Sequence, residues 1–315
     1  WLDDPSAREE RAARLRDLVL ERHTYDRRAR DLREILRAWV AAPRVDIAVA
    51  PPHWGRAELW GDYHFGRALQ GALERGGLHA GLRLRDAWES SGSERADAAI
   101  SLFGVLPRRT REAQVSVLWI FSHPDLVDDA VVAGQDLVFV ASDRFAAELV
   151  KRGVPALPLH QCTDVRRFRP VEGGPHHRAL FVANARKADR VVVKELARAG
   201  VDLALYGTGW GPKKLPKGVW RGDHIPNDAL PAFYAAADIV LNDTWQDMAA
   251  HGFISNRLYD ASAAGAFTLS DEVPGIEPAF LAGAAAVTFV WLLSFALEPR
   301  LPVRWLAAVT LPWGL

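Results

Sequence analysis

The sequence predicts an α/β protein built from two doubly wound domains. Strand-like apolar runs alternate with amphipathic helical stretches over residues 45–152 and again over residues 179–242. Such alternation is typical of a parallel sheet with helices on both faces. The chain has 315 residues, of which 49% are hydrophobic, and this is enough for two cores of ordinary domain size.

The composition excludes several classes of protein. Lys plus Arg and Asp plus Glu both number 39, so no net charge draws the chain to nucleic acid or to an acidic membrane. The single Cys162 cannot form an internal disulfide, which fits a reducing compartment. Residues 1–37 are too densely charged for a signal peptide. The adjacent His176 and His177 could bind a metal ion, but no third metal ligand accompanies them. We therefore expect a cytoplasmic protein without a metal site.

Residues 1–42 are predicted to form two helices. Asp3 or Asp4 before Pro5 is a suitable helix start, and apolar side chains follow at spacings of three and four. The alternative is a solvated helical hairpin or a coiled-coil fragment. We expect one apolar side to pack against the folded body through Leu15, Leu18, Leu32 and Leu36.

Residues 43–168 are predicted to form the first α/β domain. Val45 to Ala50 alternates as a strand, and Asp62 is placed to cap a helix that ends at Gly76. Two later runs are continuously apolar, as in a sheet covered on both faces. The other predicted elements are strands at Leu82 to Leu84, Ala98 to Phe103, Val115 to Phe121 and Leu137 to Ala141, and a helix from Asp143 to Arg152.

Two loops of this domain lie where a ligand is expected, beyond the carboxyl ends of parallel strands. They cover residues 54–64 and 122–125. A base for a hydroxyl acceptor needs a lone pair near neutral pH, which Asp and His supply. The candidates are Asp62, His64 and His123. Two of them have a structural alternative, because Asp62 can cap its helix and His123 can close a turn.

Residues 169–280 are predicted to form the second domain, after an irregular Pro- and Gly-rich crossing at residues 166–178. A strand at Ala179 to Ala183 leads into a loop with Asn184 and Arg186, and then into a helix. Loop amides and a helix N-terminus at a strand end form an anion site. Arg186 would add positive charge there, and a solvated surface charge is the alternative.

The next strand, Val201 to Tyr206, ends in a loop that begins at Gly207. This loop is not the dinucleotide fingerprint, because Pro212 follows where a helix would begin. Trp210 could stack on a nucleotide base or anchor the loop. Further along, Asn227 is expected to cap a helix that precedes a strand at residues 239–242.

Residues 251–278 are predicted to form a compact helix, strand and turn. Ser255 is placed to cap the helix with its hydroxyl, and Gly265 to end it. Helical spacing puts Asn256, Arg257 and Asp260 on one polar face. An amide, a guanidinium and a carboxylate suit a ligand with hydroxyls and negative oxygens, such as a nucleotide sugar. The alternative is a surface pair between Arg257 and Asp260.

The run from Ser255 to Ala266 resembles the donor-binding segment of GT-B glycosyltransferases, in particular the CgeB-like (spore-maturation-type) group. The resemblance covers residues 45–280 and implies two Rossmann-like domains that face each other across a cleft. It implies a hexosyltransferase that moves a sugar from a nucleotide-diphosphate sugar to a saccharide or other hydroxyl acceptor, with neither a metal ion nor a cofactor.

The resemblance also implies roles for individual residues. The first domain would present the acceptor. Arg186 and Arg257 would stabilise the leaving diphosphate, and Asp260 would hold ribose. The implied donor-binding set is Asn184, Arg186, Gly207, Trp210, Ser255, Asn256, Arg257 and Asp260.

The sequence departs from that pattern in three places. Gly252 stands eight residues before Asp260, where many retaining GT-B enzymes carry a glutamate. Residues 1–42 resemble the C-terminal helices of a preceding or permuted unit. The uncharged stretch that begins at Leu281 opens an apolar tail, residues 281–315, which is predicted to be aberrant, a buried element or a membrane anchor. A degenerate non-catalytic scaffold, and then a nucleotide-sugar epimerase, are the alternative functions.

Overall fold

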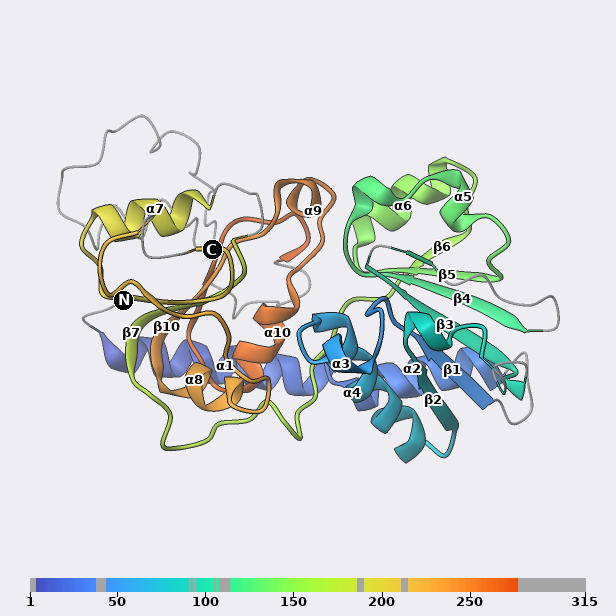
Figure 1. Ribbon diagram of the computed structural model, residues 1–315, viewed down its shortest axis with the longest axis horizontal. Helices are drawn as coiled ribbons and strands as arrows, with labels where there is room; N and C mark the ends of the chain where they lie inside the picture. The colour runs from blue at the N-terminus through green and yellow to red at the C-terminus, as the bar shows by residue number, and fades with distance from the viewer. Residues whose placement is uncertain are drawn as a thin grey trace, which may run out of the picture.

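The protein contains two parallel β-sheets, each flanked by helices, which lie side by side (Figure 1). The computed structural model describes residues 4–37, 44–90, 92, 95–104, 106–107, 114–185, 190–210 and 215–276. Within these residues the first sheet has six strands in the order β2-β1-β3-β4-β5-β6, and the second has five in the order β11-β10-β7-β8-β9. This arrangement confirms the predicted fold class.

The first domain follows the predicted β-then-α order. Every residue of β3 is buried, as expected for a strand covered on both faces. Its strands are β1 (Arg44–Ala48), β2 (His79–Arg83), β3 (Ala98–Phe103), β4 (Val115–Ile120), β5 (Leu137–Val140) and β6 (Ala156–Pro158). Its helices are α3 (Trp54–Ala57), α4 (Gly61–Arg75), α5 (Asp129–Val132) and α6 (Asp143–Lys151), with 3₁₀ turns η1 (Arg85–Ala87) and η3 (Pro124–Leu126).

The second domain repeats this pattern with a smaller sheet. Its strands are β7 (His177–Val182), β8 (Leu203–Tyr206), β9 (Trp220–Gly222), β10 (Ala237–Asn242) and β11 (Thr268–Ser270). Its helices are α7 (Val191–Arg198), α8 (Leu230–Ala236), α9 (Gln246–Ala250) and α10 (Asn256–Ala263). Because β7 lies between β8 and β10, the strand order reverses between β7 and β10, and such a switch point is where open α/β sheets bind ligands.

The two N-terminal helices, α1 (Pro5–Arg22) and α2 (Tyr25–Arg37), pack on different domains (Figure 1). Leu15 and Val19 of α1 belong to a core cluster of the second domain, against which Leu18 also packs. Leu32 of α2 is buried in the core of the first domain. The solvated-hairpin alternative is therefore wrong for these helices, although the side chain of Leu36 lies outside the described residues.

The chain crosses between the domains at two places that lie against each other. The junction of α1 and α2 forms an isolated parallel bridge between Thr24 and Thr163. The amide of Tyr25 donates to the Thr163 carbonyl at 2.8 Å, and the amide of Thr163 donates to the His23 carbonyl at 2.7 Å. The N-terminal segment is thus hydrogen-bonded to the linker that joins the two domains.

Asp4 caps α1 as predicted, because its carboxylate accepts a hydrogen bond from the Ala7 amide. The other three predicted helix caps differ from the structure. Helix α4 begins at Gly61, so Asp62 lies inside its first turn and frees its carboxylate for other contacts. Helix α8 begins three residues after Asn227. Ser255 precedes α10 as predicted, but its hydroxyl makes no capping hydrogen bond.

Some expectations fall outside the described residues. These are the 281–315 tail, the loop position of Arg186 and the first boundary near residue 42. In the part of the chain that the structure describes, no helix is long and apolar enough to cross a membrane.

Candidate active site

Both domains and helix α2 line a pocket of about 170 Å³, which we call the central chamber. The start of α4 forms its first-domain wall, and the polar side of α10 forms the opposite wall. Its lining residues are Tyr25, Gly61, Asp62, His64, Phe65, Ala68, Phe121, Gln161, Asp164, Arg167, Phe168, Asn227, Asn256 and Asp260.

A second pocket of about 170 Å³, the strand-end chamber, adjoins it and shares Gly61, His64 and Asn227 with it. Its second-domain wall is made by the segments that follow β7, β8 and β9. The remaining lining residues are Glu58, Leu59, Trp60, Val182, Ala183, Asn184, Tyr206, Gly207, Asp223, His224, Ile225 and Leu230. The two chambers therefore form one cleft at the carboxyl ends of the second sheet.

Asp260 is a titratable group of the central chamber with a strongly perturbed pKa. One carboxylate oxygen accepts from the Thr163 hydroxyl at 2.7 Å, and the other accepts from the Asn256 amide at 2.8 Å. Burial raises the pKa of Asp260 to about 7, against these two hydrogen bonds, which lower it. Folding takes up a proton here between about pH 4 and pH 7, so the stability contribution of Asp260 falls as pH rises through that window.

The predicted common face of α10 is only partly correct. Asn256 and Asp260 bond to each other and line the central chamber, but Arg257 lines neither chamber. Arg257 instead donates to the Asn242 side chain at 2.6 Å and to the Val182 carbonyl at 2.8 Å. No ion pair joins Arg257 to Asp260 among the described residues, so the surface-pair alternative is also wrong.

Arg257 occupies the switch point of the second sheet. Val182 ends β7 and Asn242 ends β10, so a single guanidinium ties these two strand ends together. It also lies over the Phe181 ring at 5.2 Å. Burial lowers the pKa of Arg257, and the nearby Tyr234 and Asp271 oppose that shift. Such a bridge fixes the geometry of the floor of the cleft.

His64 lines both chambers and has the geometry of a base. Its Nε2 lies 2.9 Å from the Glu58 carbonyl oxygen, which can only accept. The neutral ring therefore carries its proton on Nε2 and keeps a lone pair on Nδ1. Burial lowers the pKa of His64, although the Glu58 carbonyl and carboxylate raise it. The ring is thus neutral at physiological pH.

The other two candidate bases are placed differently. Asp62 lines the central chamber and faces Gly104, where an added Cβ would stand 2.7 Å from its Oδ2. His123 lines neither chamber, and its Nδ1 lies 3.0 Å from the Ser122 hydroxyl. Its φ of 52° lies in the left-handed region. This conformation fits the alternative role of His123, which is to close a turn before Pro124.

The loops after β7 and β8 hold each other through backbone and side-chain contacts. Asn184 accepts from the Thr208 amide at 2.9 Å and from its hydroxyl at 3.0 Å. Gly207 has a φ of 146°, and a Cβ there would lie 2.0 Å from the Ala183 carbonyl oxygen. Only glycine therefore permits this close approach. Asn184 and Gly207 line the strand-end chamber.

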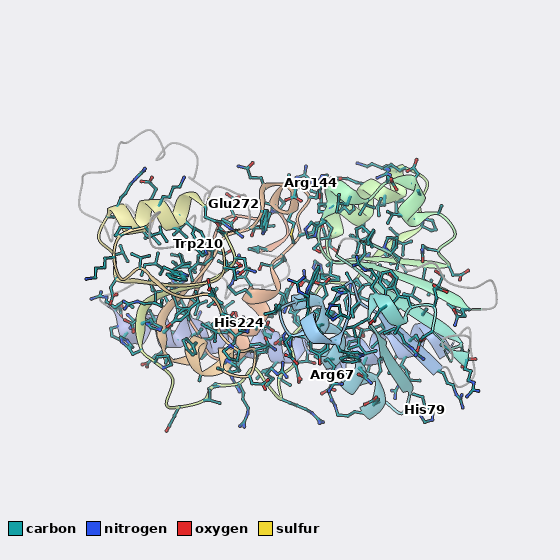
Figure 2. The ribbon with its side chains drawn as sticks, in the orientation of Figure 1. Arg67, His79, Arg144, Trp210, His224 and Glu272 are labelled. Carbon is teal, nitrogen blue, oxygen red and sulfur yellow. The ribbon has the colours of Figure 1, made fainter. Side chains whose placement is uncertain are left out.

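Trp210 anchors its loop and lies outside both chambers. Its indole nitrogen donates to the Ala183 carbonyl at 2.7 Å, and the ring is 7% exposed. It belongs to the core cluster that includes Val193 and Leu196 of α7, inside the second domain (Figure 2). Of the two sequence alternatives, the structure favours the anchor over base stacking.

Gly252, which stands eight residues before Asp260, is enclosed at the domain contact. Its φ is +74°, and an added Cβ would lie 2.8 Å from the Pro274 carbonyl and 3.1 Å from the Ser142 hydroxyl. The adjacent His251 carbonyl accepts from that same hydroxyl. A side chain at this position would have to displace the neighbouring backbone or force the domains apart.

Sequence reasoning missed several lining residues. Arg167 comes from the predicted crossing, Asp164 from the segment just before it, and Tyr25 from the N-terminal segment. Asn227 was assigned only a capping role, yet it lines both chambers. Contacts between distant segments, such as the pairing of Thr24 with Thr163, carry no local pattern in the sequence.

Two facing parallel α/β domains with a cleft between them define the GT-B class of fold. Residues 186–293 match a family model described as Glycosyl transferase-like. Over this segment the chain is similar to that family, and this match and the fold together support its assignment as a glycosyltransferase. In the described residues, no group of three or more His, Cys, Asp or Glu side chains is arranged to hold a metal ion.

Comparison with solved structures finds similar proteins at low identity. One is an alpha-glucosyltransferase in complex with UDP and a 13-mer DNA containing a HMU base, with 12% identity, a TM-score of 0.47, and coverage of 73% of this chain and 79% of that one. Another is the glycosyltransferase SnogD from Streptomyces nogalater, with 15% identity, a TM-score of 0.28, and coverage of 76% and 87%. No curated protein matches the sequence.

Proposed function

We propose that the protein transfers a sugar from a nucleotide-diphosphate sugar to a hydroxyl acceptor without a metal ion. The observation that carries this proposal is the continuous cleft, in which the strand ends of a glycosyl transferase-like domain face His64 and Asp62 of the first domain. We also propose membership of the CgeB-like group, on the strength of the run from Ser255 to Ala266.

In this proposal the strand-end chamber takes the nucleotide. Asn184 and Gly207 supply a close backbone surface at the ends of β7 and β8. Asp260 then accepts hydrogen bonds from ribose or sugar hydroxyls next to that chamber. A bound hydroxyl replaces part of the hydration that the buried carboxylate has lost, so binding favours its ionised form.

The leaving diphosphate needs positive potential. Because Arg257 is committed to the strand ends, we assign it an indirect role, in which it fixes β7 and β10 beneath the ligand. The first amides of α10 and the side chain of Arg186 would contact the phosphates, as helix N-termini and guanidinium groups commonly do. His64 would accept the proton of the attacking hydroxyl through Nδ1.

Calorimetric titration with UDP-, GDP- and dTDP-sugars tests the proposal. We expect one nucleotide class to bind at one site per chain, and Asp260→Asn to weaken it by about tenfold or more, because a charge-assisted hydrogen bond is lost. Asp238→Asn is the matched control, since Asp238 lies near the opposite end of β10 and pairs with Arg8. Absence of binding to every nucleotide sugar would refute the proposed function.

A second candidate function is a non-catalytic nucleotide-sugar-binding module. The enclosed glycine at position 252 favours it, because no carboxylate can stand there without moving the neighbouring backbone. Binding without release of nucleoside diphosphate, over a panel of saccharide acceptors, would support the module over the transferase.

A further inference from the structure

Tyr25 is the first residue of α2 and lies at the contact between the N-terminal segment and the linker. Its amide donates to the Thr163 carbonyl at 2.8 Å, and its ring meets the edge of Phe65 with a centroid distance of 5.0 Å. The residue is only 4% exposed, and yet it lines the central chamber. The backbone and the ring are therefore fixed, and the small accessible part of the side chain faces the cleft.

The phenol of Tyr25 forms no hydrogen bond to another residue in the described part of the chain. Burial raises its pKa well above the usual value, and the nearby Asp260 and Asp164 raise it further, so it stays a neutral O–H group. The phenol oxygen is not one of the fully buried polar atoms without a partner, and it lines the chamber, where water or a ligand can bond to it.

A second unsatisfied group lies in the same chamber. The Asn256 side-chain oxygen is buried and has no hydrogen-bond partner among the described residues, whereas its amide nitrogen donates to Asp260. Helices α2 and α10 therefore offer the chamber a hydroxyl, an amide oxygen and a carboxylate. This set matches a ligand that carries several hydroxyl groups on a small frame.

The shape of the chamber agrees with that chemistry. Its volume of about 170 Å³ is below the range of complete drug-sized sites, so it takes one ring of a larger ligand. Phe65 and Phe121 stack at 5.5 Å and supply an apolar wall beside the polar groups. The adjoining strand-end chamber leaves room for the rest of the ligand.

We propose that the Tyr25 phenol hydrogen-bonds to a hydroxyl of the sugar ring of the bound nucleotide sugar, and that the N-terminal segment is thereby part of the active site. This inference rests on the proposed function. In this role Tyr25 determines the specificity for the sugar and does not contact the nucleotide part of the ligand.

Calorimetry on the full chain with Tyr25→Phe tests the inference, because phenylalanine keeps the ring against Phe65 and removes only the hydroxyl. We expect the Kd of the nucleotide sugar to rise about tenfold, while the Kd of the corresponding nucleoside diphosphate changes less than about twofold. Tyr259→Phe is the control, since Tyr259 lies next to Asp260 in sequence, is fully buried and lines neither chamber.

Three results would overturn the inference. An unchanged Kd for the nucleotide sugar would show that the phenol makes no contact with it. An equal loss for the diphosphate and the nucleotide sugar would assign Tyr25 a purely structural role. If the wild-type chain binds neither ligand, the proposed function itself fails, and this outcome is distinguished by the wild-type titration alone.

Discussion

Replacement of His64 by alanine is expected to lower the turnover of the nucleotide sugar by about 10²- to 10⁴-fold, the usual contribution of a general base. The physical reason is that Nε2 is held by the Glu58 carbonyl, so the Nδ1 lone pair of a neutral ring is the proton acceptor. The measurement is release of nucleoside diphosphate in the presence of an acceptor panel. Donor affinity, measured by calorimetry, should change little.

The pH dependence of turnover gives a second readout for His64. Burial lowers its pKa from the ordinary value of 6.5, so kcat/KM should begin to fall only at a pH below 6.5. His79→Ala is the matched control, because His79 is exposed at the start of β2, at the far edge of the first domain (Figure 2). If His64→Ala lowered turnover by less than about threefold, His64 would not be the general base, and Asp62 would be the next candidate.

Arg257→Met is expected to lower the free energy of unfolding by about 3 kcal/mol, because hydrogen bonds from a charged donor are lost and their buried acceptors remain. The Asn242 side chain is fully buried, and its oxygen would have no replacement partner among the described residues. Arg257→Lys should restore only part of the stability, since an ammonium group is a point donor and cannot reproduce the planar fork. Urea denaturation at pH 7 measures both variants.

The control for Arg257 is Arg198→Met on α7. Arg198 pairs with Glu195 at the surface, with 72% of its side chain exposed, and such pairs contribute between zero and about 1 kcal/mol. If Arg257→Met were as stable as the wild type but failed to bind the nucleotide sugar, the guanidinium would act on the ligand directly. That result would contradict the indirect role that we assign to it.

The element order could be predicted because it rests on local patterns. Continuous apolar runs located β4 and β5, and Gly265 ends α10 with a φ of +84°, as predicted from its place after the helix. Short elements were missed, because β9 and β6 have three residues each and carry no periodicity. Helices α4 and α8 begin at other positions than predicted. In both cases the expected capping residue, Asp62 or Asn227, lines the cleft instead.

Some of the residues that the sequence singled out lie along the cleft, whereas the directions of other side chains could not be predicted. Asn184, Gly207, Asn256 and Asp260 all line the cleft, as do Asp62 and His64. Helical spacing grouped Arg257 with Asp260, but it could not weigh the carbonyl of Val182 and the buried Asn242, which come from other strands. Likewise, no local signal places Tyr25 in the same chamber as Asp260, because that arrangement depends on pairing between distant segments, such as Thr24 with Thr163.

The enclosed Gly252 and the two paired crossings suggest how the cleft keeps its shape. His251 contacts Glu148 at 2.8 Å and Phe253 packs into the core of the first domain, so the loop before α10 is held by the first domain. On the other side, Thr163 bonds to both the N-terminal segment and Asp260. The polar side of α10 is thus positioned by both domains at once.

Amide hydrogen exchange with and without the nucleotide sugar that binds is the most direct test of the central claim, that the ligand lies between the two domains. We predict slower exchange in residues 61–69 of the first domain and, simultaneously, in residues 182–185, 206–210 and 254–260 of the second. Exchange that is unchanged in these segments at saturating ligand, or slowed only at a surface remote from both chambers, would contradict the account.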